Sequence, residues 1–169
     1  IAIIRRRLAA CLSRSSALIK RGVDALVSAI LLVVLAPVFA LVALLVKLDS
    51  RGTVFYSQTR VGVDGRKFRM LKFRSMVPGA HRQREELAHL NESEGLFKIA
   101  DDPRVTRVGR ALRRLSLDEV PQVLNVLRGE MSLVGPRPLP VRDYLLLEEW
   151  HRRRYEVLPG MTGLWQISG

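Results

Sequence analysis

Cysteine, histidine and aromatic residues are scarce in this sequence. The single cysteine, Cys11, has no partner for an internal disulfide. The three histidines show no metal-ligand spacing with Cys11, so we expect no zinc site. The sequence also lacks a Ser-, Gly- and Pro-rich linker between domains, and its 169 residues are enough for one domain of ordinary size. We therefore treat the chain as one functional unit.

Acidic residues are also few: 16 Asp and Glu stand against 28 Lys and Arg, which gives a net charge of +12. Such an excess favours an anionic partner, and phospholipid headgroups, a phosphorylated substrate and nucleic acid all qualify. The positive charge is spread along the chain, however, and no nucleic-acid-binding motif is present. We therefore expect no nucleic-acid partner and an anionic phospholipid membrane instead.

Charge is absent altogether from the segment Ala25 to Val46, in which Ser28 is the only polar residue. As a straight helix these 22 residues would reach about 33 Å, enough to cross the hydrocarbon core of a bilayer. The run is too long for a signal peptide and lacks a small-residue cleavage pattern. A buried core helix this apolar on every face would need a larger protein around it. The segment is therefore predicted to enter a membrane.

Pro37 and basic flanks leave two topologies open for this segment. The proline removes a helical hydrogen bond, so a kink or a break is expected there. Both flanks are basic, so charge asymmetry does little to orient a spanning helix; the flanking residues are Arg14, Lys20, Arg21, Lys47 and Arg51. A helix that returns to the face it entered would satisfy both observations. The residues alone slightly favour a spanning helix, because membrane helices tolerate proline.

The rest of the chain predicts a small β-hairpin and several helices. Residues 53–61 and 66–76 are rich in β-branched and aromatic residues and flank a Gly-Val-Asp-Gly turn, and their alternation suggests a bulge after Met70. The hairpin is crowded with basic residues, which suit either a solvated surface near anionic lipid or phosphate binding. Residues 80–90 have helical composition. Helices are also predicted around 104–115, with arginines on one face, and over 143–157, where Trp150 and Tyr155 could be interfacial anchors or core residues.

Asp118 and Glu119 are the candidate site. They are predicted to lie in the first turn of a helix that ends at Gly129. Acids at a helix start interact favourably with its dipole, and Ser116 with Glu119 fits a capping box, so a structural role alone would explain the pair.

The surroundings of this pair favour a chemical role. Arg113 precedes it, and Arg137 follows in a backbone stiffened by two prolines; arginine suits phosphate oxygens. Adjacent carboxylates suit Mg²⁺, and an aspartate can attack phosphorus directly. Together with the membrane segment, these features suggest phosphoryl transfer onto a lipid.

A set of ordered motifs between Lys20 and Gly169 resembles the bacterial polyprenol-phosphate phosphoglycosyl transferases. These motifs are Lys20-Arg21 with Asp24 before a Pro-containing apolar helix, Phe55 with Gln58, Arg60 and Gly62, residues 72–76 (KFRSM), 116–122, 128–132, 135–138 (GPRP) and 159–164. The resemblance implies transfer of a sugar-1-phosphate from a UDP-sugar to undecaprenyl phosphate, with release of UMP, at the start of surface-glycan assembly.

The resemblance also implies roles and a location. Asp118 would be the nucleophile that holds a covalent sugar-phosphate, Glu119 would place Mg²⁺ and tune the pair, and Arg113, Arg137 and Lys72 would contact phosphate. The membrane segment would be a re-entrant helix with both ends on the cytoplasmic side of the bacterial inner membrane. This implication outweighs the slight preference for a span. One departure is Ala36, where the family commonly has Ser before the proline.

The expected organisation is an α+β, mostly helical monotopic membrane protein with interfacial amphipathic helices and a small β-hairpin. Residues 1–19 form a basic segment that could be the remnant of a larger N-terminal region. Residues 20–47 form the re-entrant helix, with the break at Pro37. Residues 48–169 form a cytoplasmic catalytic domain, which we expect to be truncated at its C-terminus. The sequence leaves a homo-oligomer open, together with a second hypothesis: a non-catalytic, membrane-tethered binding or adaptor protein of glycan assembly.

Overall fold

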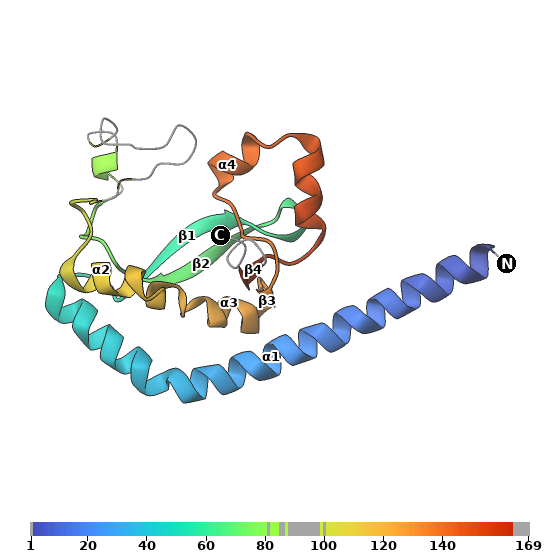
Figure 1. The fold of residues 1–169 in the computed structure, drawn as a ribbon, viewed down its shortest axis with the longest axis horizontal. Helices are drawn as coiled ribbons and strands as arrows, with labels where there is room; N and C mark the ends of the chain where they lie inside the picture. The colour runs from blue at the N-terminus through green and yellow to red at the C-terminus, as the bar shows by residue number, and fades with distance from the viewer. Residues whose placement is uncertain (1, 81, 85–86, 88–98, 100, 164–169) are drawn as a thin grey trace. The chain divides into compact units, whose positions relative to one another are not determined.

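The computed structural model describes residues 2–80, 82–84, 87, 99 and 101–163. In chain order its elements are α1 (Ala2–Asp49), β1 (Phe55–Val61), η1 (Val63–Gly65), β2 (Lys67–Phe73), η2 (Arg82–Arg84), α2 (Arg107–Arg114), η4 (Leu117–Glu119), α3 (Gln122–Arg128), β3 (Ser132–Val134), α4 (Val141–Leu145), η5 (Glu149–Glu156) and β4 (Gly160–Thr162) (Figure 1). Elements labelled η are 3₁₀ helices. Helices with small sheets confirm the predicted mixture of helix and β-structure.

The chain forms two compact units, and both take residues from α1, β1 and β2. The first unit comprises residues 1–36, 57–71 and 122–169, and the second comprises residues 37–56 and 72–121. The division within α1 falls between Ala36 and Pro37. Each unit has a core of its own, and each is described separately below.

The helix α1 contains the predicted membrane segment. Residues Ser15–Asp49 are long and apolar enough to cross a membrane, and only 11% of their most apolar window is buried. A core helix of a soluble protein would be mostly buried, so the low figure favours lipid contact. Helical backbone continues through Pro37. The sequence predicted a kink or a break at Pro37. The continuous helix excludes the break.

In the first unit, polar side chains at the start of the apolar segment hold α1 against later parts of the chain. Asp24 is only 5% exposed. Its carboxylate accepts hydrogen bonds from the Ser132 hydroxyl at 2.7 Å and from the Lys20 ammonium at 3.0 Å. The Arg21 guanidinium donates to the carbonyl oxygens of Val126 and Leu127, which lie in the last turn of α3. These hydrogen bonds hold the residues of α1 just before the apolar segment against α3 and β3.

The core of the first unit lies between β2, α3 and the short parallel sheet. It consists of the buried residues Phe68, Met70, Val126 and Met131, with Leu133 and Met161 against them. Strands β3 and β4 pair in parallel, with Ser132 opposite Gly160. Helix α3 ends at Arg128, and Gly129 follows with a φ of 82°, so the predicted stop is confirmed.

The predicted β-hairpin is confirmed, with β1 and β2 paired and η1 at their turn. Phe68 and Met70 of β2 belong to the core of the first unit, whereas Phe73 belongs to the core of the second. The opposite orientation of these residues led to the prediction of a bulge after Met70. The bulge itself remains a prediction.

The second unit contains the other half of α1. Val42 and Val46 pack with Phe73 and Leu112 in its core. Phe73 is also stacked against Phe55, with ring centroids 5.3 Å apart. The C-terminal half of the apolar segment therefore has one face on protein, although neighbouring residues such as Leu44 and Leu48 remain 56% and 75% exposed.

Arg74 and Asp49 join the end of α1 to the rest of the second unit. The buried Arg74 guanidinium donates to the carbonyl oxygens of Ser50 at 2.7 Å and Arg51 at 2.9 Å, which satisfies acceptors at the helix end. The Asp49 carboxylate accepts from the backbone N–H of Val108 at 3.0 Å, in the first turn of α2. Arg74 thus has a structural task, which is neither the solvated surface nor the phosphate binding considered for the basic hairpin.

Helix α2 is shorter than predicted and is amphipathic as predicted. Gly109 and Leu112 are buried, while Arg107, Arg110 and Arg114 are exposed. Thr106 caps the helix by accepting from the N–H of Gly109 at 3.0 Å. The prediction that Arg104 lies on the exposed face was wrong, because this residue precedes the helix and is only 5% exposed.

The helix predicted over residues 143–157 is also wrong in extent. The chain forms α4 and then the 3₁₀ segment η5, with a break between Leu145 and Glu149. Tyr155 is 6% exposed and meets Tyr144 edge-on at 4.9 Å, so it is a core residue and not an interfacial anchor. The Trp150 side chain and most of the predicted helix at 80–90 lie outside the described residues.

Gly109 offers a test of the packing of α2. A Cβ atom there would overlap the Ser75 backbone, whereas nothing lies within 4 Å of a Cβ atom at Gly22 in α1. Gly109→Ala is expected to lower the free energy of unfolding by about 1–3 kcal/mol, because backbone cannot yield like a side chain. Gly22→Ala is the control, with a gain of up to about 1 kcal/mol. Denaturation of the full chain in detergent measures both, and equal stabilities of the two variants would contradict the close approach.

Candidate functional site

Asp118 and Glu119 lie in η4, a single 3₁₀ turn of the second unit. The predicted position in the first turn of the following helix was wrong, because α3 begins only at Gln122. The capping box is also wrong: Ser116 adopts a left-handed conformation with φ 55° and makes no cap hydrogen bond through its side chain. Ordinary helix capping therefore does not explain the two acids.

Lys72, at the end of β2, faces the two acids. Its ammonium nitrogen lies 2.6 Å from Glu119 Oε1 and 4.0 Å from Asp118 Oδ2. The side chains of Lys72, Asp118 and Glu119 are 17%, 12% and 21% exposed, so water screens these charges only partly. The structure thus brings together three of the residues that the sequence proposed for the site. Lys72 pairs closely with Glu119 and more weakly with Asp118.

The electrostatic environment of Asp118 is a balance of opposing effects. Burial raises the pKa of its carboxyl above the ordinary value, and the neighbouring Glu119 carboxylate raises it further. The positive charges of Lys72 and Arg113 lower this pKa, but they do not cancel the effect of burial. The Asp118 carboxylate is consequently more basic than an exposed aspartate, which suits a nucleophile.

Arg113 approaches the acids from the last turn of α2. Its Nε donates to the Ser75 hydroxyl at 2.9 Å, and its charge acts on both Asp118 and Asp102. The residue as a whole is exposed. Ser75 was not among the residues selected from the sequence, although it belongs to the same motif as Lys72. Its position within that motif could have identified Ser75 from the sequence.

A second feature that was missed is the buried pair Asp102 and Arg104. Two hydrogen bonds, of 2.5 Å and 2.8 Å, join the side chains, and Arg104 also donates to the Ala80 carbonyl at 3.1 Å. The Arg104 carbonyl in turn accepts from the N–H of Val77 at 2.9 Å. This pair anchors the segment before α2 to the segment after Ser75, so it supports the site without being part of it.

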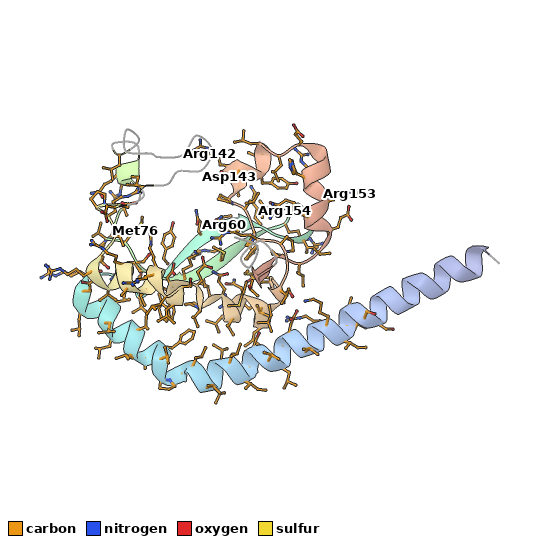
Figure 2. The ribbon with its side chains drawn as sticks, viewed as in Figure 1. Arg60, Met76, Arg142, Asp143, Arg153 and Arg154 are labelled. Carbon is orange, nitrogen blue, oxygen red and sulfur yellow. The ribbon has the colours of Figure 1, made fainter. Side chains whose placement is uncertain are left out.

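Arg137 belongs to the first unit, in the segment after β3. Its carbonyl oxygen accepts from Arg154 at 3.1 Å, and that of Pro138 accepts from Arg60 at 3.3 Å. Figure 2 labels both donors, which come from η5 and β1. The N–H of Val61 also donates to the Leu139 carbonyl at 3.0 Å. Protein contacts therefore fix the backbone of Arg137, as its two flanking prolines led us to expect, and contact with phosphate remains a prediction.

The donor set can be compared with the needs of a magnesium ion. Within the described residues there is no cluster of three or more His, Cys, Asp or Glu side chains. Asp118 and Glu119 alone supply carboxylate oxygens, and Mg²⁺ commonly binds one or two carboxylates together with substrate phosphates. The site thus fits an ion that shares its ligands with a phosphorylated substrate. It does not provide a complete protein cage.

Comparison with known proteins agrees with this chemistry. The family model described as bacterial sugar transferase matches residues 15–169. The exopolysaccharide production protein ExoY of Sinorhizobium fredii is 47% identical over 156 residues, which cover 89% of this chain and 69% of that protein.

Two larger relatives carry more explicit names. The undecaprenyl-phosphate glucose phosphotransferase of Komagataeibacter xylinus is 47% identical over 94% of this chain and 29% of its own length. The UDP-glucose:undecaprenyl-phosphate glucose-1-phosphate transferase of Escherichia coli is 44% identical over 94% of this chain and 32% of its own length. The chain thus spans about a third of these two proteins. By the match to the family model and the identity to these relatives, the chain belongs to the bacterial sugar transferase family.

Proposed function

We propose that this transferase moves a sugar-1-phosphate from a UDP-sugar to undecaprenyl phosphate, with release of UMP, in the first membrane step of polysaccharide assembly. The observation that carries the proposal is the buried, abnormally basic Asp118 carboxylate beside two cationic side chains. Related proteins are named for transfer between these same two substrates. A carboxylate held in this way is suited to attack a phosphate rather than to stabilise a fold.

The reaction proceeds in two displacements at the same phosphorus. An Asp118 carboxylate oxygen attacks the phosphate bound to the sugar, the bond from that phosphorus to the bridging oxygen breaks, and UMP leaves with the electron pair. An oxygen of the lipid phosphate then attacks the aspartyl phosphate. This step releases the Asp118 carboxylate and forms the lipid diphosphate sugar.

Lys72 and Arg113 supply the positive charge that this chemistry needs. Each reacting phosphate is anionic, so a carboxylate can approach it only where cations offset the repulsion. Both residues lie close enough to Asp118 to lower its pKa. Asp118 and Glu119 would hold Mg²⁺, which when bound neutralises charge on the substrate phosphates. Arg137 is the third cation that we assign to phosphate contact.

Contacts at both ends of the apolar segment support a re-entrant membrane helix. Asp24 and Arg21 bind residues of α3 and β3, while Asp49 and Val46 bind residues of α2 and β2. A straight span would place the two ends of the apolar segment on opposite faces of the bilayer. The described chain after Asp49 has no second segment long enough to cross back. We therefore propose that α1 bends at Pro37 and that both ends, with the catalytic residues, face the cytoplasm.

Loss of the nucleophile tests the reaction. Asp118→Asn is expected to reduce UMP release from UDP-sugars by at least about a thousandfold, since an amide cannot form the covalent intermediate. The measurement uses the full-length protein in detergent or native membranes, with a panel of UDP-sugars. Asp101→Asn, at an exposed acid of the same unit, is the matched control. Undiminished release in Asp118→Asn would remove Asp118 from the mechanism, whereas an absence of UMP release from the unchanged protein would favour a binding or adaptor role.

Stability as a function of pH tests the raised pKa of Asp118. Because the folded-state pKa lies above the ordinary value of 3.8, protonated Asp118 favours folding below that pH, and this contribution is lost as the pH rises through the folded pKa. Asp118→Asn is therefore expected to raise the melting temperature at pH 7–8 and to lose this advantage as the pH falls toward 3.8. Scans in EDTA, with Asp101→Asn as control, measure the difference. A destabilised Asp118→Asn at neutral pH would contradict the dominance of burial.

Reporter tags test the topology. Tags inserted before Lys20 and after Arg51 are expected to report the same, cytoplasmic side, because both ends of the apolar segment bind the chain that follows it. Protease protection in spheroplasts and inverted vesicles reads the two positions independently. Tags on opposite sides would restore the spanning helix.

A further inference from the structure

Lys72 occupies the position from which a cation would bind the carboxylate pair. Its ammonium group lies 2.6 Å from Glu119 and 4.0 Å from Asp118, and all three side chains are largely buried. Lys67 on the same strand is exposed, whereas the Lys72 side chain is only 17% exposed and the backbone beside it is fixed by Phe73, which is 3% exposed in the core of the second unit. The Lys72 ammonium group therefore already supplies one positive charge to the carboxylate pair.

A divalent ion and this ammonium group compete for the same oxygens. Mg²⁺ requires carboxylate oxygens at about 2.0–2.1 Å, so an ion bound to Glu119 would lie within a few ångströms of the Lys72 ammonium nitrogen. Like charges at that separation repel strongly where water is largely excluded. An ion that binds Glu119 Oε1, the oxygen now held by Lys72, is therefore expected to displace the ammonium group.

We propose that Lys72 blocks the binding of a free divalent cation, so that the ion enters only together with a nucleoside diphosphate. The diphosphate brings its own anionic oxygens. These oxygens complete the ligand set of the ion and offer the Lys72 ammonium a new partner in place of Glu119. The flexible four-carbon stem of the lysine allows its ammonium to move between the two while the backbone at Phe73 stays fixed.

The consequence is positive coupling between cation and nucleotide, with Lys72 as the element that creates it. The proposal rests on the proposed function, because that function supplies the diphosphate. It adds an order of binding that the reaction alone does not require. With Glu119 paired to Lys72, the site would also be protected from capturing divalent ions without substrate.

Binding of Mn²⁺, followed by the electron paramagnetic resonance signal of the free ion, tests the coupling in the full-length protein in detergent. Wild type is expected to bind Mn²⁺ weakly alone and about 5- to 150-fold more tightly with UDP, after correction for the Mn²⁺–UDP complex in buffer. Lys72→Met is expected to bind Mn²⁺ without UDP by a similar factor more tightly than wild type. Lys72→Arg, which keeps a cation, and Lys67→Met, at the exposed lysine of the same strand, are expected to behave as wild type.

Two outcomes would overturn the inference. Wild type that binds Mn²⁺ alone as tightly as Lys72→Met would show that the lysine is no barrier, and a lack of binding in every variant with UDP would show that the acids take no divalent ion. Melting curves establish that Lys72→Met is folded, and the addition of Glu119→Gln to it is expected to abolish the gained Mn²⁺ affinity. Failure of the proposed function is read separately, as absence of Asp118-dependent UMP release.

Discussion

The hydrogen bond from the Val108 N–H to the Asp49 carboxylate links the end of the membrane helix to the start of α2. Helix α2 leads directly into the turn that holds Asp118, and Gly109 brings this helix against the backbone of Ser75. These contacts connect the position of Asp118 to the end of α1 within the second unit. A reaction between a soluble nucleotide sugar and a lipid phosphate requires such a link, because the acceptor phosphate cannot leave the interface.

Arg74 shows how the same unit uses positive charge for structure. Its guanidinium group is buried against the carbonyl oxygens at the end of α1, and the absence of a side chain at Gly52 leaves room for it, because a Cβ atom there would overlap Arg74. Lys72, two residues earlier, turns its charge toward the acids instead. A basic residue of β2 and one just after it thus serve two purposes, which explains why the basic character of the hairpin could not by itself reveal the site.

The sequence predicted the features that depend on local pattern. Apolarity and length identified the membrane segment, alternation around a Gly-rich turn identified the hairpin, and Gly129 marked the end of α3. Prediction from the sequence failed where tertiary contacts decide the conformation. Ser116 adopts a left-handed conformation that only the surrounding fold can impose, so a turn that resembles a helix start became a separate 3₁₀ element.

The candidate site was predicted in part for a similar reason. Asp118, Glu119 and Arg113 are close in sequence, and the family motifs added Lys72, which the fold brings to them. Ser75, Asp102 and Arg104 were missed because their partners depend on how the segment before α2 pairs with the segment after β2, as in the hydrogen bond from the Thr106 N–H to the Ser75 carbonyl. No periodicity in the sequence encodes this pairing.

The unequal pairing of Lys72 with the two acids assigns them different tasks. Two carboxylates in one partly buried turn repel each other, and a single ammonium at equal distance would offset both charges equally. Here it lies 1.4 Å closer to Glu119 than to Asp118, from 2.6 Å against 4.0 Å. Glu119 therefore receives most of the compensation, while the pKa of Asp118 stays raised by burial. Asp118, the less compensated carboxylate, is the one that we propose as the nucleophile, whereas the paired Glu119 is suited to hold a cation.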